Sequence, residues 1–190
     1  MAPDFPHDLI PRSDVEHLLG AVNSMKDKLS GAAQQCELLD EDGHVPASPS
    51  YTALLQHAID AHDLTRDVLA LTAGFARSPH HTTSAGRTVL KHLAAAATMS
   101  SHAAPHFNET AECALALLRS TDPRDRRYLA NRMVIDHASA RASLRVASRC
   151  LRDAAKELDD QLGFHRFLTT LTRKEGPPAP APPRPGGRHR

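Results

Sequence analysis

Four arginines recur along one stretch of the chain, at a spacing that places guanidinium groups in a row if the stretch is helical. The row consists of Arg141, Arg145, Arg149 and Arg152. Guanidinium forks suit the oxygens of phosphates and carboxylates, so one interpretation is a binding surface for an acidic partner or a nucleic acid. The alternative is that the row is solvated or pairs within the chain, either with the acidic row Asp60, Asp63 and Asp67 or with the acidic face of the first helix. The second interpretation is favoured because opposite rows of similar length occur together.

Four strings place a histidine five residues after an arginine, and two of them, Arg87–His92 and Arg132–His137, lie wholly on expected helices. This spacing resembles the motif of the HEPN family, helical-bundle proteins many of which cut RNA. In that family the arginine binds phosphate and the histidine is an acid–base group at a dimer interface. The resemblance implies Arg132 and His137 as alternative catalytic residues. Met133 follows Arg132, where the family commonly has a polar residue, and His137 falls on an apolar stripe, which favours a core histidine.

The other histidines and acids do not form a recognisable metal or catalytic motif. His102 and His106 have the spacing that puts two imidazoles on one helix face, but Pro105 lies between them. A second cluster, His57, Asp60, His62 and Asp63, spreads over more than one helix face, so we expect surface polar residues. No HExxH, GxSxG or glycine-rich phosphate loop is present. The sequence therefore predicts no metal, no cofactor, and an interaction or regulatory protein rather than an enzyme.

A long helix is expected to position these residues. Asp122 and Pro123 are typical of a helix start, and no Gly or Pro interrupts the chain before Gly163. Apolar or small residues recur through 122–160 at alternating spacings of three and four. They are Ala130, Met133, His137, Ala140, Leu144, Ala147, Leu151, Ala154 and Leu158. The alanines predict close contact between this helix and its neighbours.

Further helices are expected in the rest of the chain, separated by segments that contain proline or glycine. Ser13 and Glu16 have the spacing of a capping box, which predicts a helix over 13–40. Ser48 and Pro49 predict the start of a second helix. The segment 84–119 reads as two helices on one line, with Asn108 capping the second, or as one helix bent at Pro105. After Gly163 we expect a short separate helix containing Phe164, Phe167, Leu168 and Leu171.

These patterns predict an all-α protein: an antiparallel up-down four-helix bundle with a long C-terminal helix and a short extra terminal helix. The expected organisation is an irregular arm over 1–12, a bundle over 13–173 and a disordered Pro/Arg-rich tail over 174–190. The long helix is expected to project or to pair with a second copy.

Charge is divided unevenly along the chain. Residues 1–70 hold four Lys and Arg against twelve Asp and Glu, whereas residues 71–190 hold nineteen against ten. The two parts therefore carry −8 and +9. A protein partner or homodimer is favoured over nucleic acid, because only Tyr128 lies near the basic residues for base stacking.

Three scattered cysteines without a CxxC predict reduced thiols and a cytoplasmic location. No run of 18 apolar residues is present, so no membrane partner is expected, and the Arg- and Ala-rich composition is typical of a bacterial genome.

Overall fold

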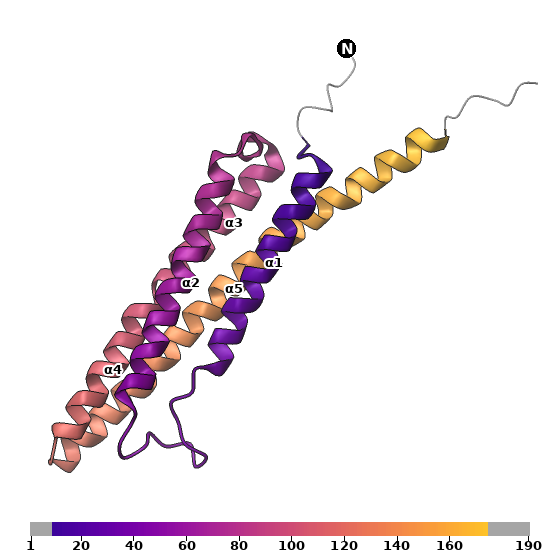
Figure 1. Cartoon of the computed structure of the whole chain (residues 1–190). Helices are drawn as coiled ribbons and strands as arrows, with labels where there is room; N and C mark the ends of the chain where they lie inside the picture. The colour runs from indigo at the N-terminus through magenta and orange to yellow at the C-terminus, as the bar shows by residue number, and fades with distance from the viewer. Residues whose placement is uncertain (1–8, 175–190) are drawn as a thin grey trace, which may run out of the picture.

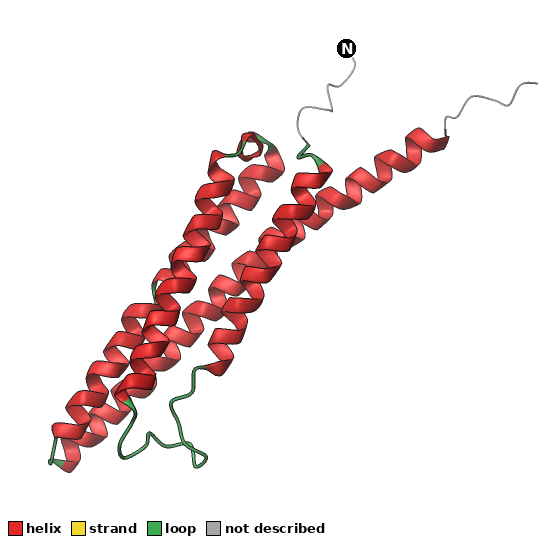
Figure 2. Ribbon diagram, in the orientation of Figure 1, coloured by secondary structure: helices red, strands yellow, loops and turns green. Residues whose placement is uncertain are grey.

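The computed structural model describes residues 9–174, and within them the chain is helical with no strand (Figure 2). The all-α class predicted from the sequence is confirmed. The elements in order are α1 (Arg12–Gln35), α2 (Tyr51–Arg77), the short 3₁₀ helix η2 (Pro79–Thr82), α3 (Ser84–Ser101), α4 (Ala103–Arg119) and α5 (Pro123–Lys174). None of these helices combines the length and the apolar composition that a membrane span requires. Residues 1–8 of the predicted arm and 175–190 of the predicted tail lie outside the described residues, whereas Ile10 is buried and Arg12 already belongs to α1.

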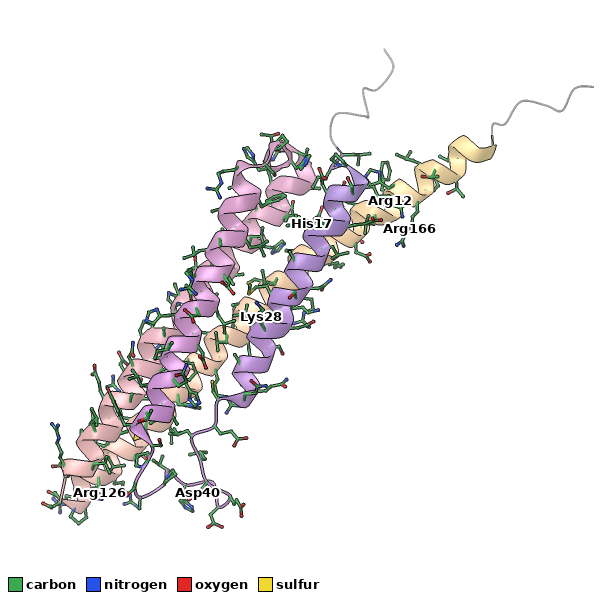
Figure 3. All side chains as sticks on the ribbon, viewed as in Figure 1. Arg12, His17, Lys28, Asp40, Arg126 and Arg166 are labelled. Carbon is green, nitrogen blue, oxygen red and sulfur yellow. The ribbon has the colours of Figure 1, made fainter. Side chains whose placement is uncertain are left out.

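Helix α5 runs the length of the molecule, and the other helices are arranged around it (Figure 1). It packs extensively on α1, α3 and α4, while α2 packs on α3 and α4 and makes little contact with α1. The loop over 36–50 and the turn from α4 into α5 lie at one end of the molecule, and η2 lies at the other. Figure 3 shows Arg126 and Asp40 at the first end, and Arg12, His17 and Arg166 toward the second. Helix α1 is therefore held mainly by α5.

The ends of α1 differ from those predicted. The expected capping box is wrong: the carbonyl of Pro11 accepts hydrogen bonds from the N–H groups of Asp14 and Val15, and Glu16 pairs with Arg12 at 2.7 Å. The helix ends at Gln35 rather than at Asp40. Acidic residues crowd the following positions, where the helix dipole disfavours negative charge, and Leu38 packs on a different part of the core.

The starts of α2 and α4 also differ from the predictions. Ser50, not Ser48, caps α2, and its hydroxyl accepts a hydrogen bond from the N–H of Ala53. The chain from 84 to 119 forms two helices, as one alternative predicted, but the break is at His102 rather than at Asn108 or Pro105. Pro105 is the third residue of α4. The N–H groups of the first turn of a helix have no carbonyl partner within it, so a proline at this position removes no hydrogen bond of α4.

The long helix predicted over 122–160 is present, and it continues to Lys174. The separate short helix after Gly163 is a wrong prediction, because α5 passes through Gly163 without interruption. A single glycine costs a helix only about 1 kcal/mol. On either side of it Leu162 is buried and the ring of His165 bonds the carbonyl of Ile10 at 2.8 Å, so packing on the start of α1 supports the continuation.

The core consists of two clusters of buried side chains. The larger cluster contains the apolar stripe of α5 from Ala140 to Leu162 and side chains from α1, α2, α3 and the start of α4. The smaller cluster joins Leu54, Ala111, Ala114, Leu117 and Met133. The alternation of Ala with Leu in α5 (Ala140, Leu144, Ala147, Leu151) is fully buried, so the predicted seam is confirmed.

Candidate functional site: an arginine-lined groove between α1 and α5

A groove of about 520 Å³ lies between α1 and α5. Helix α5 lines it with Arg145, Arg149 and Arg152, three side chains that α-helical spacing brings to one face. Helix α1 contributes the polar side chains of Ser30 and Gln34. The three arginines extend over roughly 10 Å along the helix axis. The groove therefore presents a line of guanidinium groups with hydrogen-bonding side chains opposite them.

The three arginines are exposed, and none forms an ion pair with a residue of the described chain. Of the two forms of the favoured prediction, pairing of the row with the acidic row of α2 is wrong, whereas the exposure of these three arginines agrees with a solvated row. Those acids have other partners: Lys28 pairs with Asp67 at 3.6 Å, Arg66 with Asp63 at 3.0 Å, and Gln56 donates to Asp60 at 2.8 Å. The two rows do not meet, because α1 packs on α5 beside the arginines and α2 makes almost no direct contact with α5 in the described chain.

Arg141, the first residue of the row, has a different role from the other three. It is half-buried, and its Nε donates a hydrogen bond of 2.8 Å to the carbonyl of Ala33. That carbonyl belongs to the last turn of α1, where no helical N–H is left to bond it. A second link lies farther along the groove, where the Ser148 hydroxyl donates to the carbonyl of Lys26 at 3.1 Å. These bonds fix the two walls of the groove relative to one another.

A separate cavity of about 290 Å³ lies beside the end of α1. Gln34 lines both this cavity and the groove, and the cavity is also bounded by Glu37, His137 and Arg141. The predicted arginine row is thus divided between two neighbouring spaces, with Arg141 at the cavity and the other three arginines at the groove. On the far side of the α1 end, a second cavity of about 310 Å³ is lined by His57, Phe107 and Leu144.

His57, Phe107 and His137 form a ring cluster at the junction of the two core clusters. The centroid of Phe107 lies 5.6 Å from that of His57 and 5.4 Å from that of His137, and the two imidazoles are 5.9 Å apart. Burial and then the neighbouring His57 lower the pKa of His137 to about 4, with a smaller effect of Arg141. Burial also lowers the pKa of His57. Both imidazoles are therefore neutral at physiological pH.

Arg132, the other residue implied by the HEPN resemblance, faces a pair of carboxylates. Its Nε donates to Oδ2 of Asp136 at 2.8 Å, and its Nη2 lies 3.5 Å from Oε2 of Glu109. His137 is only 3% exposed and packs against the rings of Phe107 and His57. Within the single chain, Arg132 is therefore paired with acids, and His137 is neutral and enclosed.

The thiol of Cys36, directly after α1, is buried and lines the same cavity as His57. Burial, with a further contribution from Asp60, raises its pKa to about 11. Thiol nucleophiles require a lowered pKa, so Cys36 is suited to packing rather than to catalysis. All three cysteines are free.

The sequence did not predict the residues that reach the groove or Arg132 only through the packing of neighbouring helices. Ser30 and Gln34 form the opposite wall of the groove, but no spacing rule relates them to α5. Glu109 and Asp136 are brought together from α4 and α5. The i, i+4 interval from Arg132 to Asp136 was a signal for their ion pair.

In comparisons with protein-family models, with curated proteins and with solved structures, the chain matches none.

Proposed function

We propose that this chain is a non-enzymatic interaction protein that binds an acidic segment of a partner protein in the groove between α1 and α5. The observation that carries the proposal is the set of three exposed arginines, Arg145, Arg149 and Arg152, which line one groove without an ion pair in the described chain. The proposal includes an antiparallel four-helix bundle in which α3 and α4 together count as the third helix. Helix α5 is the fourth helix of this bundle and supplies one full wall of the groove.

The lining of the groove favours carboxylates over nucleic acid. No aromatic side chain of the described residues lines it, so the lining gives bases no surface on which to stack. Ser30, Gln34 and Ser148 lie among the arginines and add hydrogen-bonding groups suited to a peptide. The arginines follow helical spacing, and a partner helix with glutamates at the same spacing presents one carboxylate to each guanidinium.

Binding of a fluorescently labelled helical peptide with glutamates at i, i+4 and i+7 tests this function. The full chain should bind this peptide, and affinity should fall steeply as salt is raised. The double variant Arg145→Ala/Arg149→Ala should bind at least tenfold more weakly, because each charged hydrogen bond contributes about 1.5–3 kcal/mol. The double variant Arg124→Ala/Arg127→Ala is the matched control, since it removes the same charge from exposed positions of the same helix.

Equal peptide affinity in the two double variants would contradict a role for the groove. A short single-stranded oligonucleotide, titrated under the same conditions, tests the competing class of partner. Tighter binding of the oligonucleotide than of the peptide, lost in Arg145→Ala/Arg149→Ala, would replace the acidic protein partner with a nucleic acid. Self-association through α5 stays a separate prediction, and light scattering of the full chain measures it.

A further inference from the structure

Three potential metal ligands converge where the first turns of α4 face α5, away from the arginine groove. His106 and Glu109 are one helical turn apart on α4, and Asp136 approaches from α5. Nδ1 of His106 lies 3.6 Å from Oε2 of Glu109 and 3.7 Å from Oδ1 of Asp136. All three atoms lie within 4.8 Å of one another. One nitrogen and two carboxylate oxygens thus point at a common space.

These distances are close to those of a metal centre. Zinc binds imidazole nitrogen and carboxylate oxygen at about 2.0–2.2 Å, which separates adjacent ligands of a tetrahedral site by about 3.3 Å. The distances from His106 exceed that separation by only a few tenths of an ångström, a change that small side-chain rotations supply. The side chains of His106 and Glu109 are partly exposed, so the site lies near the surface of the molecule.

The surroundings of the three ligands also suit a cation. Asp136 is 4% exposed, and its other oxygen, Oδ2, accepts the hydrogen bond from Arg132 at 2.8 Å. A ligating carboxylate is commonly held in this way by a second residue behind it. Nδ1 of His106 is buried and has no hydrogen-bond partner within the described chain. The ligand set therefore has an oriented carboxylate and a free nitrogen.

We propose that His106, Glu109 and Asp136 bind one divalent transition-metal ion, with Zn²⁺ as the ion of best fit. Arg132 positions Asp136 and offsets one of the two carboxylate charges. Water completes the coordination. The ion links α4 to α5 beside the smaller core cluster and is independent of the groove. The sequence predicted no metal because two ligands lie on one helix and the third on another.

Metal binding by the chelator-treated full chain tests the site. Equilibrium dialysis against ZnCl₂ should give one tight ion per chain, and CoCl₂ should produce a visible spectrum at the same stoichiometry. His106→Ala and Glu109→Gln should each weaken the tight site at least tenfold. His102→Ala is the matched control: it removes an exposed histidine one turn earlier and should leave the affinity unchanged. The control separates the site from adventitious binding by the thirteen histidines.

Thermal unfolding supplies a second measurement. Zn²⁺ should raise the melting temperature of the original chain and of His102→Ala, because an ion that binds only the folded state stabilises it. It should not raise that of His106→Ala. Both tested ligands are partly exposed, so their variants are expected to fold, which circular dichroism checks. Absence of a tight ion in the original chain, or equal affinity in His106→Ala, would overturn the proposal.

Discussion

The guanidinium of Arg141 on α5 donates a 2.8 Å hydrogen bond to the carbonyl of Ala33 in the last turn of α1. Arg141→Ala should therefore destabilise the fold by about 1–2 kcal/mol, since the carbonyl of the buried residue Ala33 loses a charged partner. Urea unfolding measures this loss. Arg145→Ala removes an exposed arginine one turn away and is the control, expected to change stability by less than about 0.5 kcal/mol. Equal stability of the two variants would show that the bond does not hold α1.

The buried ring of His137 makes stability depend on pH. Its pKa in the folded state is about 4, against 6.5 as the unperturbed value, so between these values the unfolded chain binds the proton more readily. Stability should be fully present above pH 6.5 and fall as pH is lowered toward 4, by up to about 3 kcal/mol. His57, Arg141 and Glu37 border the same region, and the lowered pKa of His57 acts in the same direction.

Urea unfolding at several pH values, for the original chain and for His137→Gln, measures the contribution of His137. The variant has no group that titrates there, so its stability should fall less between pH 6.5 and 4. The difference between the two curves isolates His137 from the other acid-sensitive groups. Parallel curves for the two proteins would contradict the prediction.

Gly86 permits a close approach between the start of α3 and η2. A Cβ at this position would collide with the backbone carbonyl of His80. Gly86→Ala should destabilise the fold by about 1–3 kcal/mol, because backbone atoms have to move. Gly20→Ala is the opposite control, since Gly20 lies within α1 with open space around it, and alanine there should stabilise by about 0.5–1 kcal/mol. Thermal melting of both variants measures the expected loss of stability in Gly86→Ala and the expected gain in Gly20→Ala.

Ser50 is the side-chain cap of α2, a role that the Ser48–Pro49 pattern predicted for Ser48. Ser50→Ala should cost about 1 kcal/mol because the N–H of Ala53 loses its acceptor. Ser48→Ala should have little effect, as its position is exposed and precedes the cap. If Ser48→Ala were the more damaging change in chemical unfolding, the helix would begin earlier than the structure shows.

The helical segments were predictable because their evidence is local. The predicted stripe repeats with helical period, and the structure buries every member from Met133 to Leu158, while Ala130 at its start is half-buried. The ends were less predictable, because several residues compete for each one. Pro11 accepts the first helical N–H groups in place of Ser13, and tertiary packing of Leu162 outweighs the cost of Gly163.

The all-α class, the long C-terminal helix and the arginine row could be predicted from the sequence, since each depends on intervals along one helix. What those residues face depends on how the helices pack. The tertiary structure placed α1 rather than α2 beside the arginines, so Asp60, Asp63 and Asp67 do not neutralise them. It also brought Asp136 of α5 to His106 and Glu109 of α4. The physical reason is that pairing between helices depends on the rotation and contact of whole apolar faces, which no single spacing records.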